Sequence, residues 1–142
     1  MIVVDTNIIG YLYLSSDRSA QVERALAKDL VWAAPLLWRS ELRNVLALYL
    51  RKRLLTLETA QQIMNEAVRL MQGREYEVAS SRVLALAAGS TCSAYDCEFV
   101  ALAQDLGVPL VTVDKQVIGQ FPAVAVALED YVCDSSESGG AG

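Results

Sequence analysis

Four acidic residues of this chain occupy positions at which an α/β protein would gather carboxylates. Asp5 follows the first short apolar run of the sequence, and Asp114 follows a later one. Glu41 and Asp96 fall among apolar residues at the spacing of a helix face. Converging carboxylates bind a hard divalent cation such as Mg²⁺ or Mn²⁺, which activates water and stabilises charge on a phosphoryl group. The four acids therefore predict metal-dependent hydrolysis of a phosphodiester.

The chain contains no histidine, which removes several other kinds of active site. Ser-His-Asp and Cys-His catalysis are excluded, and so is any histidine-liganded metal centre. The three cysteines, Cys92, Cys97 and Cys133, form no CxxC pair and are expected to be small apolar residues of the interior. Carboxylates and lysines remain to carry the chemistry.

Length and charge fit one compact domain without a wide basic surface. The 142 residues suffice for a full hydrophobic core. The formal net charge of −5 argues against binding nucleic acid by counterion release alone, although active-site acids contribute to that balance. The charge-free stretches are too short to span a bilayer, and no basic segment precedes an apolar run at the N-terminus. We therefore expect no membrane span, no signal peptide and a cytoplasmic location.

Strands and helices are expected to alternate along the chain. Apolar runs predict strands at residues 2–4, 31–34, 76–79, 110–113 and 123–127. Periodicity and caps predict helices at residues 8–14, 20–30, 35–53, 57–72, 82–88 and 94–106. This alternation favours an α/β fold with a mainly parallel sheet covered on both faces. Ligand sites of such sheets lie beyond the carboxyl ends of the strands, where Asp5 and Asp114 stand.

Glu41 is the acid whose position is hardest to explain structurally. Leu37, Glu41, Val45 and Leu48 follow steps of four, four and three, which places the carboxylate within a predicted apolar stripe. An unpaired charge there would be costly. Each acid also has an ordinary structural explanation, because carboxylates are common at helix starts and turns. Asp5 and Asp96 could stabilise helix N-termini, Asp114 could start a turn, and Glu41 could pair with a basic neighbour.

With these residues in place, the chain resembles the PIN-domain family, and particularly the VapC-like toxins of toxin–antitoxin systems. The resemblance covers about residues 1–132 and rests on four motifs in order. They are Ile2-Val3-Val4-Asp5-Thr6-Asn7, Trp38-Arg39-Ser40-Glu41-Leu42, Ser93-Ala94-Tyr95-Asp96 and Val111-Thr112-Val113-Asp114-Lys115. The resemblance implies a three-layer α/β/α fold with a mainly parallel central sheet. Residues 133–142 are polar and rich in Gly and Ser, and are expected to form a disordered tail.

The resemblance also implies an activity and a site. It implies a Mg²⁺- or Mn²⁺-dependent endoribonuclease, the toxin of a toxin–antitoxin pair, acting on RNA as a homodimer restrained by an antitoxin protein. Motif matching assigns the catalytic acids as Asp5, Glu41, Asp96 and Asp114. Asp5 and Asp96 are then the direct metal ligands, while Glu41 and Asp114 act directly or through water.

Further residues are candidates for supporting roles. Thr6 or Asn7 is expected to support the first carboxylate, and Thr112 to orient Asp114 or a substrate phosphate. The basic candidates for RNA contact are Arg39, Arg43 and Lys115, although solvated helix faces also explain such charges.

Two other functions stay open at this point. A phosphohydrolase of the haloacid-dehalogenase type also places an aspartate after its first strand, but Asn7 stands where its second acid would be. The other is an interaction module that keeps the acidic pocket without turnover. Release of phosphate from small phosphoesters would favour the first, and metal binding without RNA cleavage the second.

Overall fold

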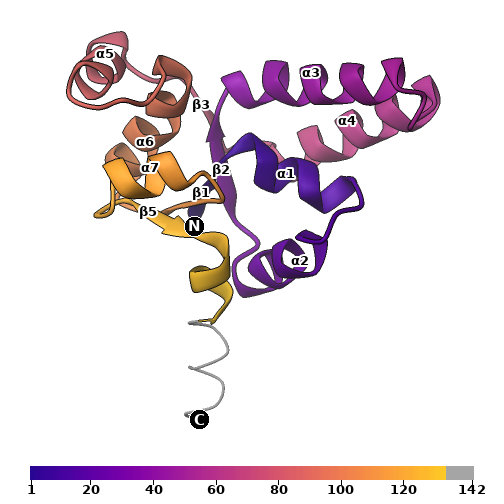
Figure 1. The fold of residues 1–142 in the computed structure, drawn as a ribbon, viewed down its shortest axis with the longest axis horizontal. Coiled ribbons are helices and arrows are strands. Elements are labelled where there is room, and N and C mark those ends of the chain that lie inside the picture. The colour runs from indigo at the N-terminus through magenta and orange to yellow at the C-terminus, as the bar shows by residue number, and fades with distance from the viewer. Residues whose placement is uncertain (134–142) are drawn as a thin grey trace.

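The computed structural model describes residues 1–133 and contains a five-stranded parallel sheet with the strand order β3-β2-β1-β4-β5 (Figure 1). The strands are β1 (Ile2–Val4), β2 (Trp32–Pro35), β3 (Glu75–Tyr76), β4 (Leu110–Thr112) and β5 (Ala125–Ala127). The parallel sheet predicted from the alternation of elements is confirmed. The third strand is shorter than the predicted 76–79 and begins one residue earlier.

The seven named helices cover the sheet from two sides. They are α1 (Thr6–Tyr13), α2 (Ser19–Lys28), α3 (Leu37–Arg51), α4 (Leu57–Met71), α5 (Ser80–Ala88), α6 (Ala94–Leu106) and α7 (Lys115–Gln120). Figure 1 shows α1 to α4 on one side of the sheet and α5 and α6 on the other, with α3 and α4 extending as a pair. This arrangement is the three-layer α/β/α fold expected from the sequence.

The central strand β1 fixes where the first acid lies. Ile2, Val3 and Val4 are β-branched and fully buried, as expected for a strand covered on both faces. Val3 pairs with Ala33 on one side and Leu110 on the other. Because β1 and β4 run parallel and adjacent, the residues after them emerge at the same edge of the sheet.

The buried face of helix α3 differs from the face that the sequence predicted. Its buried residues are Trp38, Leu42 and Leu46, spaced four apart, whereas Leu48 of the predicted stripe is 46% exposed. The predicted stripe therefore runs along the side of the core face and not through its centre. Glu41 is only partly buried as a result.

Two helical segments were not predicted. The six residues that follow Asp114 form α7, and residues 128–133 are helical as well. Cys133, assigned to the tail by the sequence, belongs to that last segment; the rest of the predicted tail lies outside the described residues. None of the helices found within residues 1–133 is both long and apolar enough to cross a membrane.

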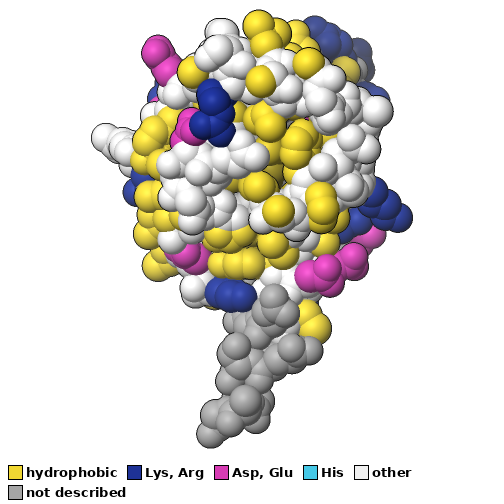
Figure 2. Space-filling view, turned by 90° about the vertical axis from the view of Figure 1, so that its left-hand side faces the viewer, with side chains coloured by type: hydrophobic (Ala, Val, Ile, Leu, Met, Phe, Trp, Pro, Cys, Tyr) yellow, Lys and Arg dark blue, Asp and Glu magenta, His cyan; other side chains and the backbone are white. Residues whose placement is uncertain are grey.

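Hydrophobic side chains also gather at the surface on one side of the molecule. Figure 2 shows them around a hollow on the side that carries α5, α6 and β5. On this side a hollow of about 310 Å³ lies between the end of α6 and β5, and its lining includes Val108, Pro109, Val124 and Val126. Edge strand β5 pairs only with β4 within the described residues, so an apolar face adjoins an unpaired strand edge.

Candidate active site

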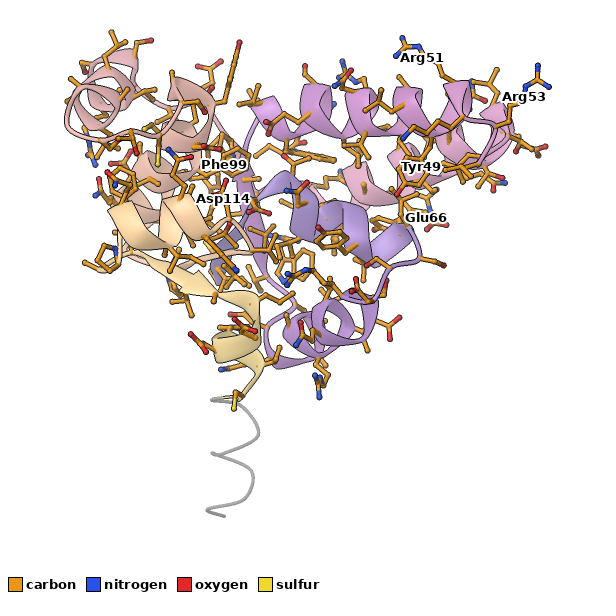
Figure 3. All side chains as sticks on the ribbon, in the orientation of Figure 1. Tyr49, Arg51, Arg53, Glu66, Phe99 and Asp114 are labelled. Atoms are coloured by element: carbon orange, nitrogen blue, oxygen red, sulfur yellow. The ribbon has the colours of Figure 1, made fainter. Side chains whose placement is uncertain are left out.

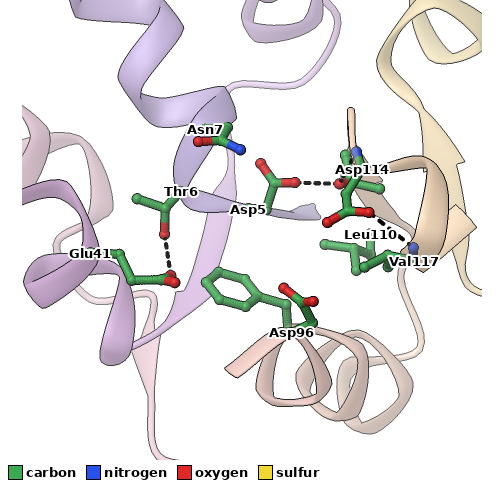
Figure 4. Close-up of a pocket in the computed structure, with 10 residues that line it drawn as sticks. Asp5, Thr6, Asn7, Glu41, Asp96, Leu110, Asp114 and Val117 are labelled. Carbon is green, nitrogen blue, oxygen red and sulfur yellow. Dashed lines mark hydrogen bonds between the residues drawn. The ribbon is translucent and has the colours of Figure 1, made fainter. Parts of the chain in front are cut away.

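One cavity at the carboxyl edge of the sheet brings together all four predicted acids (Figure 4). It has a volume of about 80 Å³, enough for several water molecules. Its charged and polar lining residues are Asp5, Glu41, Asp96 and Asp114, with Thr6, Asn7 and Thr112. Every residue predicted as an acid or as a support therefore lines the same cavity.

Two of the acids come from adjacent strands. Asp5 follows β1 and donates its backbone N–H to the carbonyl oxygen of Val111 in β4, at 3.4 Å. One residue, Val113, separates Asp114 from the end of β4, and Asp114 is the N-cap of α7. The parallel pairing of β1 with β4 thus carries both carboxylates to the same edge of the sheet.

The other two acids come from helices. Glu41 lies in the second turn of α3, which packs against α1. Asp96 lies in the first turn of α6, whose N-cap Ser93 accepts the Asp96 N–H at 3.1 Å. Helix α6 packs against β1, β2 and β4, so it holds Asp96 over the same edge of the sheet.

Buried hydroxyl groups hold three of the acids in place. Thr112 donates its hydroxyl to Oδ2 of Asp5 and accepts the Asp114 N–H at 3.0 Å. Thr6 donates its hydroxyl to Oε1 of Glu41 at 2.7 Å, and not to Asp5 as the sequence predicted. The Asn7 side chain is exposed and makes no hydrogen bond within the described part of the chain.

Helix capping and cavity lining are combined in two of the acids. Asp5 is the N-cap of α1 and accepts the Ile8 N–H on Oδ1 at 3.1 Å. Asp114 is the N-cap of α7 and accepts two backbone N–H groups on Oδ1, from Gln116 at 2.9 Å and Val117 at 3.2 Å. The capping explanation is therefore correct for Asp5, whereas Asp114 caps a helix where only a turn was expected. Each residue also lines the cavity.

Burial and mutual repulsion disfavour the charged forms of Asp5, Glu41 and Asp96. Burial raises the pKa of Asp5 from 3.8 to about 6, against the hydrogen bonds from Thr112 and Ile8, and the charges of Asp114 and Glu41 raise it further. Burial and then the charge of Asp96 raise the pKa of Glu41, while burial and then Asp114 raise that of Asp96. A cation in the cavity would relieve this cost.

The donor set suits a hard cation. The cavity offers carboxylate, hydroxyl and amide oxygens, with no thiol or imidazole in its lining, and Mg²⁺ and Mn²⁺ prefer oxygen. Within residues 1–133, no three Asp, Glu, His or Cys side chains form a group able to hold a metal ion by themselves. Mg²⁺ needs only one or two protein carboxylates, because it keeps several of its waters when bound.

The predicted RNA contacts are placed differently from the acids. The guanidinium of Arg39 makes two hydrogen bonds to the carboxylate of Glu75, at 2.7 and 2.6 Å, so a structural partner occupies it. Arg43 and Lys115 are exposed and form no ion pair among residues 1–133. None of the three lines the cavity.

The sequence missed part of the cavity's apolar wall. Phe99, a buried residue of α6 that was not among the candidate residues, lines the cavity. Its spacing of three from Asp96 was the available signal. Val117 likewise lies three residues after Asp114, but it was missed because its helix α7 was not predicted.

Fold and cavity together define a three-layer α/β/α protein with an acidic site at the carboxyl edge of a parallel sheet. Residues 2–125 match the PIN domain family. The chain belongs to this family.

Individual relatives agree with the family. Ribonuclease VapC3 of Pyrobaculum aerophilum is 31% identical over 126 residues, covering 87% of this chain and 96% of the relative. The crystal structure of PAE2754 from the same organism has a TM-score of 0.70 at 19% identity and 96% coverage of both chains. A toxin–antitoxin complex from Klebsiella pneumoniae contains a chain with a TM-score of 0.67 at 21% identity, covering 90% of this chain and 98% of that one.

Proposed function

We propose that this protein is a Mg²⁺- or Mn²⁺-dependent endoribonuclease and the toxin of a toxin–antitoxin pair. The observation that carries the proposal is the single cavity lined by Asp5, Glu41, Asp96 and Asp114, which come from four different elements. The kinship with a ribonuclease at 31% identity supports RNA as the substrate. The PIN-domain assignment favours this function over a haloacid-dehalogenase-type phosphohydrolase.

The acids would have the roles that motif matching with the PIN-domain family implies. Asp5 and Asp96 would be direct ligands of the cation, and Glu41 and Asp114 would bind it directly or through water. When bound, Mg²⁺ or Mn²⁺ would supply activation of a water molecule and stabilisation of charge on the phosphoryl oxygens. Thr112 would keep the Asp5 carboxylate in one orientation through its hydroxyl.

The remaining residues would restrict and position the substrate. Thr6 would hold Glu41 toward the cavity through the 2.7 Å hydrogen bond. Phe99, Leu110 and Val117 form an apolar wall, which limits the water available at the acids. Exposed Arg43 and Lys115 remain the candidates for phosphate contact outside the cavity, whereas pairing with Glu75 argues against Arg39.

A cleavage assay tests the proposal. The purified chain is incubated with a panel of structured and messenger RNAs, with Mg²⁺, with Mn²⁺ and with a chelator, and cleavage sites are mapped. We expect cuts that require metal and that Asp5→Asn and Asp96→Asn abolish. Asp130→Asn is the matched control, because this exposed acid lies outside the cavity.

Two outcomes would contradict the proposal. Cutting that persists in Asp5→Asn and Asp96→Asn would come from a contaminating nuclease. Metal binding without cleavage of any RNA would indicate an interaction module that keeps the acidic pocket without turnover.

The proposal includes two protein partners. A cognate antitoxin is supported by the structural similarity to a chain of a toxin–antitoxin complex. A homodimer is supported by the apolar face beside edge strand β5 (Figure 2), and light scattering of the full chain would measure it. A cytoplasmic location, where such an enzyme would meet RNA, belongs to the same proposal.

A further inference from the structure

A second hollow adjoins the acidic cavity, between α1 and α3. Thr6 and Asn7 line both hollows, so the two lie on either side of these residues. The remainder of the second lining is mostly apolar and includes Tyr11, Val45 and Tyr49. We refer to this hollow as the tyrosine groove.

The tyrosine groove runs along α3, away from the acids. On α3, Glu41 lines the cavity, and Val45 and Tyr49 line the groove at successive steps of four residues. Residues four apart lie on the same side of a helix. One side of α3 therefore leads from a catalytic candidate to a tyrosine.

Helix α1 forms the opposite wall in the same way. Thr6 and Asn7 lie beside the cavity, and Gly10, Tyr11 and Leu14 follow at helical spacing along the groove. Because Gly10 has no side chain, α1 fills less of the space between the two helices at this position. Figure 3 shows Tyr49 toward the end of α3 that lies farther from Asp114.

The lining has the chemistry of a site for one nucleobase. Tyr11 and Tyr49 are partly exposed, and neither phenolic hydroxyl has a hydrogen-bond partner among residues 1–133. Bases of single-stranded RNA stack on such rings. At the junction with the cavity, the exposed side-chain amide of Asn7 offers a donor and an acceptor, which match the edge of a base.

We propose that the tyrosine groove binds the base of a nucleotide flanking the cleaved bond, with Tyr49 and Tyr11 as the stacking surface and Asn7 as the polar contact. This inference rests on the proposed ribonuclease function. The shared lining favours RNA as the occupant, because Thr6 and Asn7 place the groove beside the acids that a substrate phosphate would reach. The groove has a volume of about 50 Å³, so a base would stack on the two rings at its mouth and would not be enclosed by it.

Steady-state cleavage of one mapped single-stranded RNA tests the stacking surface. Tyr49→Ala should raise KM about tenfold or more and change the base preference beside the cut, with little change in kcat, because stacking contributes to binding. Tyr49→Phe keeps the ring and should restore the wild-type KM. Leu48→Ala is the matched control, because Leu48 precedes Tyr49 on α3 and its exposed side chain lines neither hollow.

A binding measurement separates stacking from chemistry. The same RNA carrying 2-aminopurine beside the mapped bond is titrated with Asp96→Asn protein, with Tyr49 intact or replaced by Ala. We expect fluorescence quenching with Tyr49 and its loss with Ala.

The outcomes distinguish this inference from the function on which it rests. If the wild type cleaves RNA and Tyr49→Ala has the same KM, base preference and fluorescence quenching as the wild type, the base site is overturned and the nuclease function stands. The base site would be overturned equally if Tyr49→Ala instead weakened binding of an antitoxin segment, which would assign the groove to a protein. If the wild type cleaves no RNA, the proposed function fails and the base site fails with it.

Discussion

Replacing Asp5 by asparagine should stabilise the metal-free protein. The pKa of Asp5 is raised from 3.8 to about 6, chiefly by burial. A shift of about two pKa units corresponds to an upper limit of about 3 kcal/mol. The cavity is open to water, so we expect a gain of about 1–3 kcal/mol for Asp5→Asn at pH 8. The amide oxygen can still accept the N–H of Ile8, but the NH2 group cannot accept the hydroxyl of Thr112, which keeps the gain below its upper limit.

The sign of the pH dependence follows from proton binding. Between about pH 4 and pH 6 the folded state of wild type holds a proton on Asp5 that the unfolded chain has lost. The free energy of unfolding therefore falls as the pH rises through this window and stays low above it. Glu41 and Asp96 act in the same direction, because burial raises their pKa values too.

Urea unfolding in a chelator from pH 4 to pH 8 measures the effect. The advantage of Asp5→Asn over wild type should grow with pH and level off above about pH 7. Mn²⁺ at a hundredfold excess over its dissociation constant should then stabilise wild type by about 2.7 kcal/mol, and Asp5→Asn far less. A metal-free Asp5→Asn protein less stable than wild type at pH 8, or one stabilised equally by Mn²⁺, would refute the reasoning.

Three further substitutions test one hydrogen bond of the site and two features of the surrounding fold. Thr112→Val removes the hydroxyl that lowers the pKa of Asp5, so the pH at which RNA cleavage reaches half its maximum should rise, and the free energy of unfolding should fall by about 1–2 kcal/mol; Thr112→Ser should retain both wild-type values. Glu75→Ala should cost about 2–3 kcal/mol in urea unfolding, with the cleavage rate unchanged, because the ion pair with Arg39 is lost and the buried indole N–H of Trp38 loses its acceptor. Gly107→Ala places a side chain at φ +66° after α6 and should lower stability by about 1–2 kcal/mol, whereas Gly119→Ala, with open space and no positive φ, should not.

The positions of two acids were predictable because they depend on local sequence. Short runs rich in β-branched residues predict strands, and in a parallel sheet the residues after neighbouring strands meet at one edge. Asp5 and Asp114 follow such runs, and both line the cavity. Ser93 likewise marked the start of the helix that carries Asp96, because it is a favourable N-cap.

The phase of α3 was not predictable because its sequence is apolar on too many sides. Leu37, Trp38, Val45 and Leu46 allow more than one core face, and only packing against α1 and β2 selects the face with Trp38 and Leu46. Glu41 was therefore identified correctly as a lining residue of the cavity, but from a stripe that lies beside the core.

Contacts between distant residues were also beyond the sequence. Arg39 looked free to bind RNA, and its partner Glu75 lies 36 residues away on β3. The partner of Thr112, Asp5, lies 107 residues away. The six residues of α7 are too few to show a helical period, although the N-cap Asp114 was an available signal.

The most direct test of the shared metal site is an anomalous difference map from a crystal grown or soaked with Mn²⁺. We predict a peak in the cavity within about 2.0–2.2 Å of a carboxylate oxygen of Asp5 or Asp96, with Glu41 and Asp114 reaching it directly or through ordered water. The same crystal form of Asp5→Asn should lose the peak. A wild-type map with manganese bound elsewhere, and none among the four carboxylates, would contradict the account.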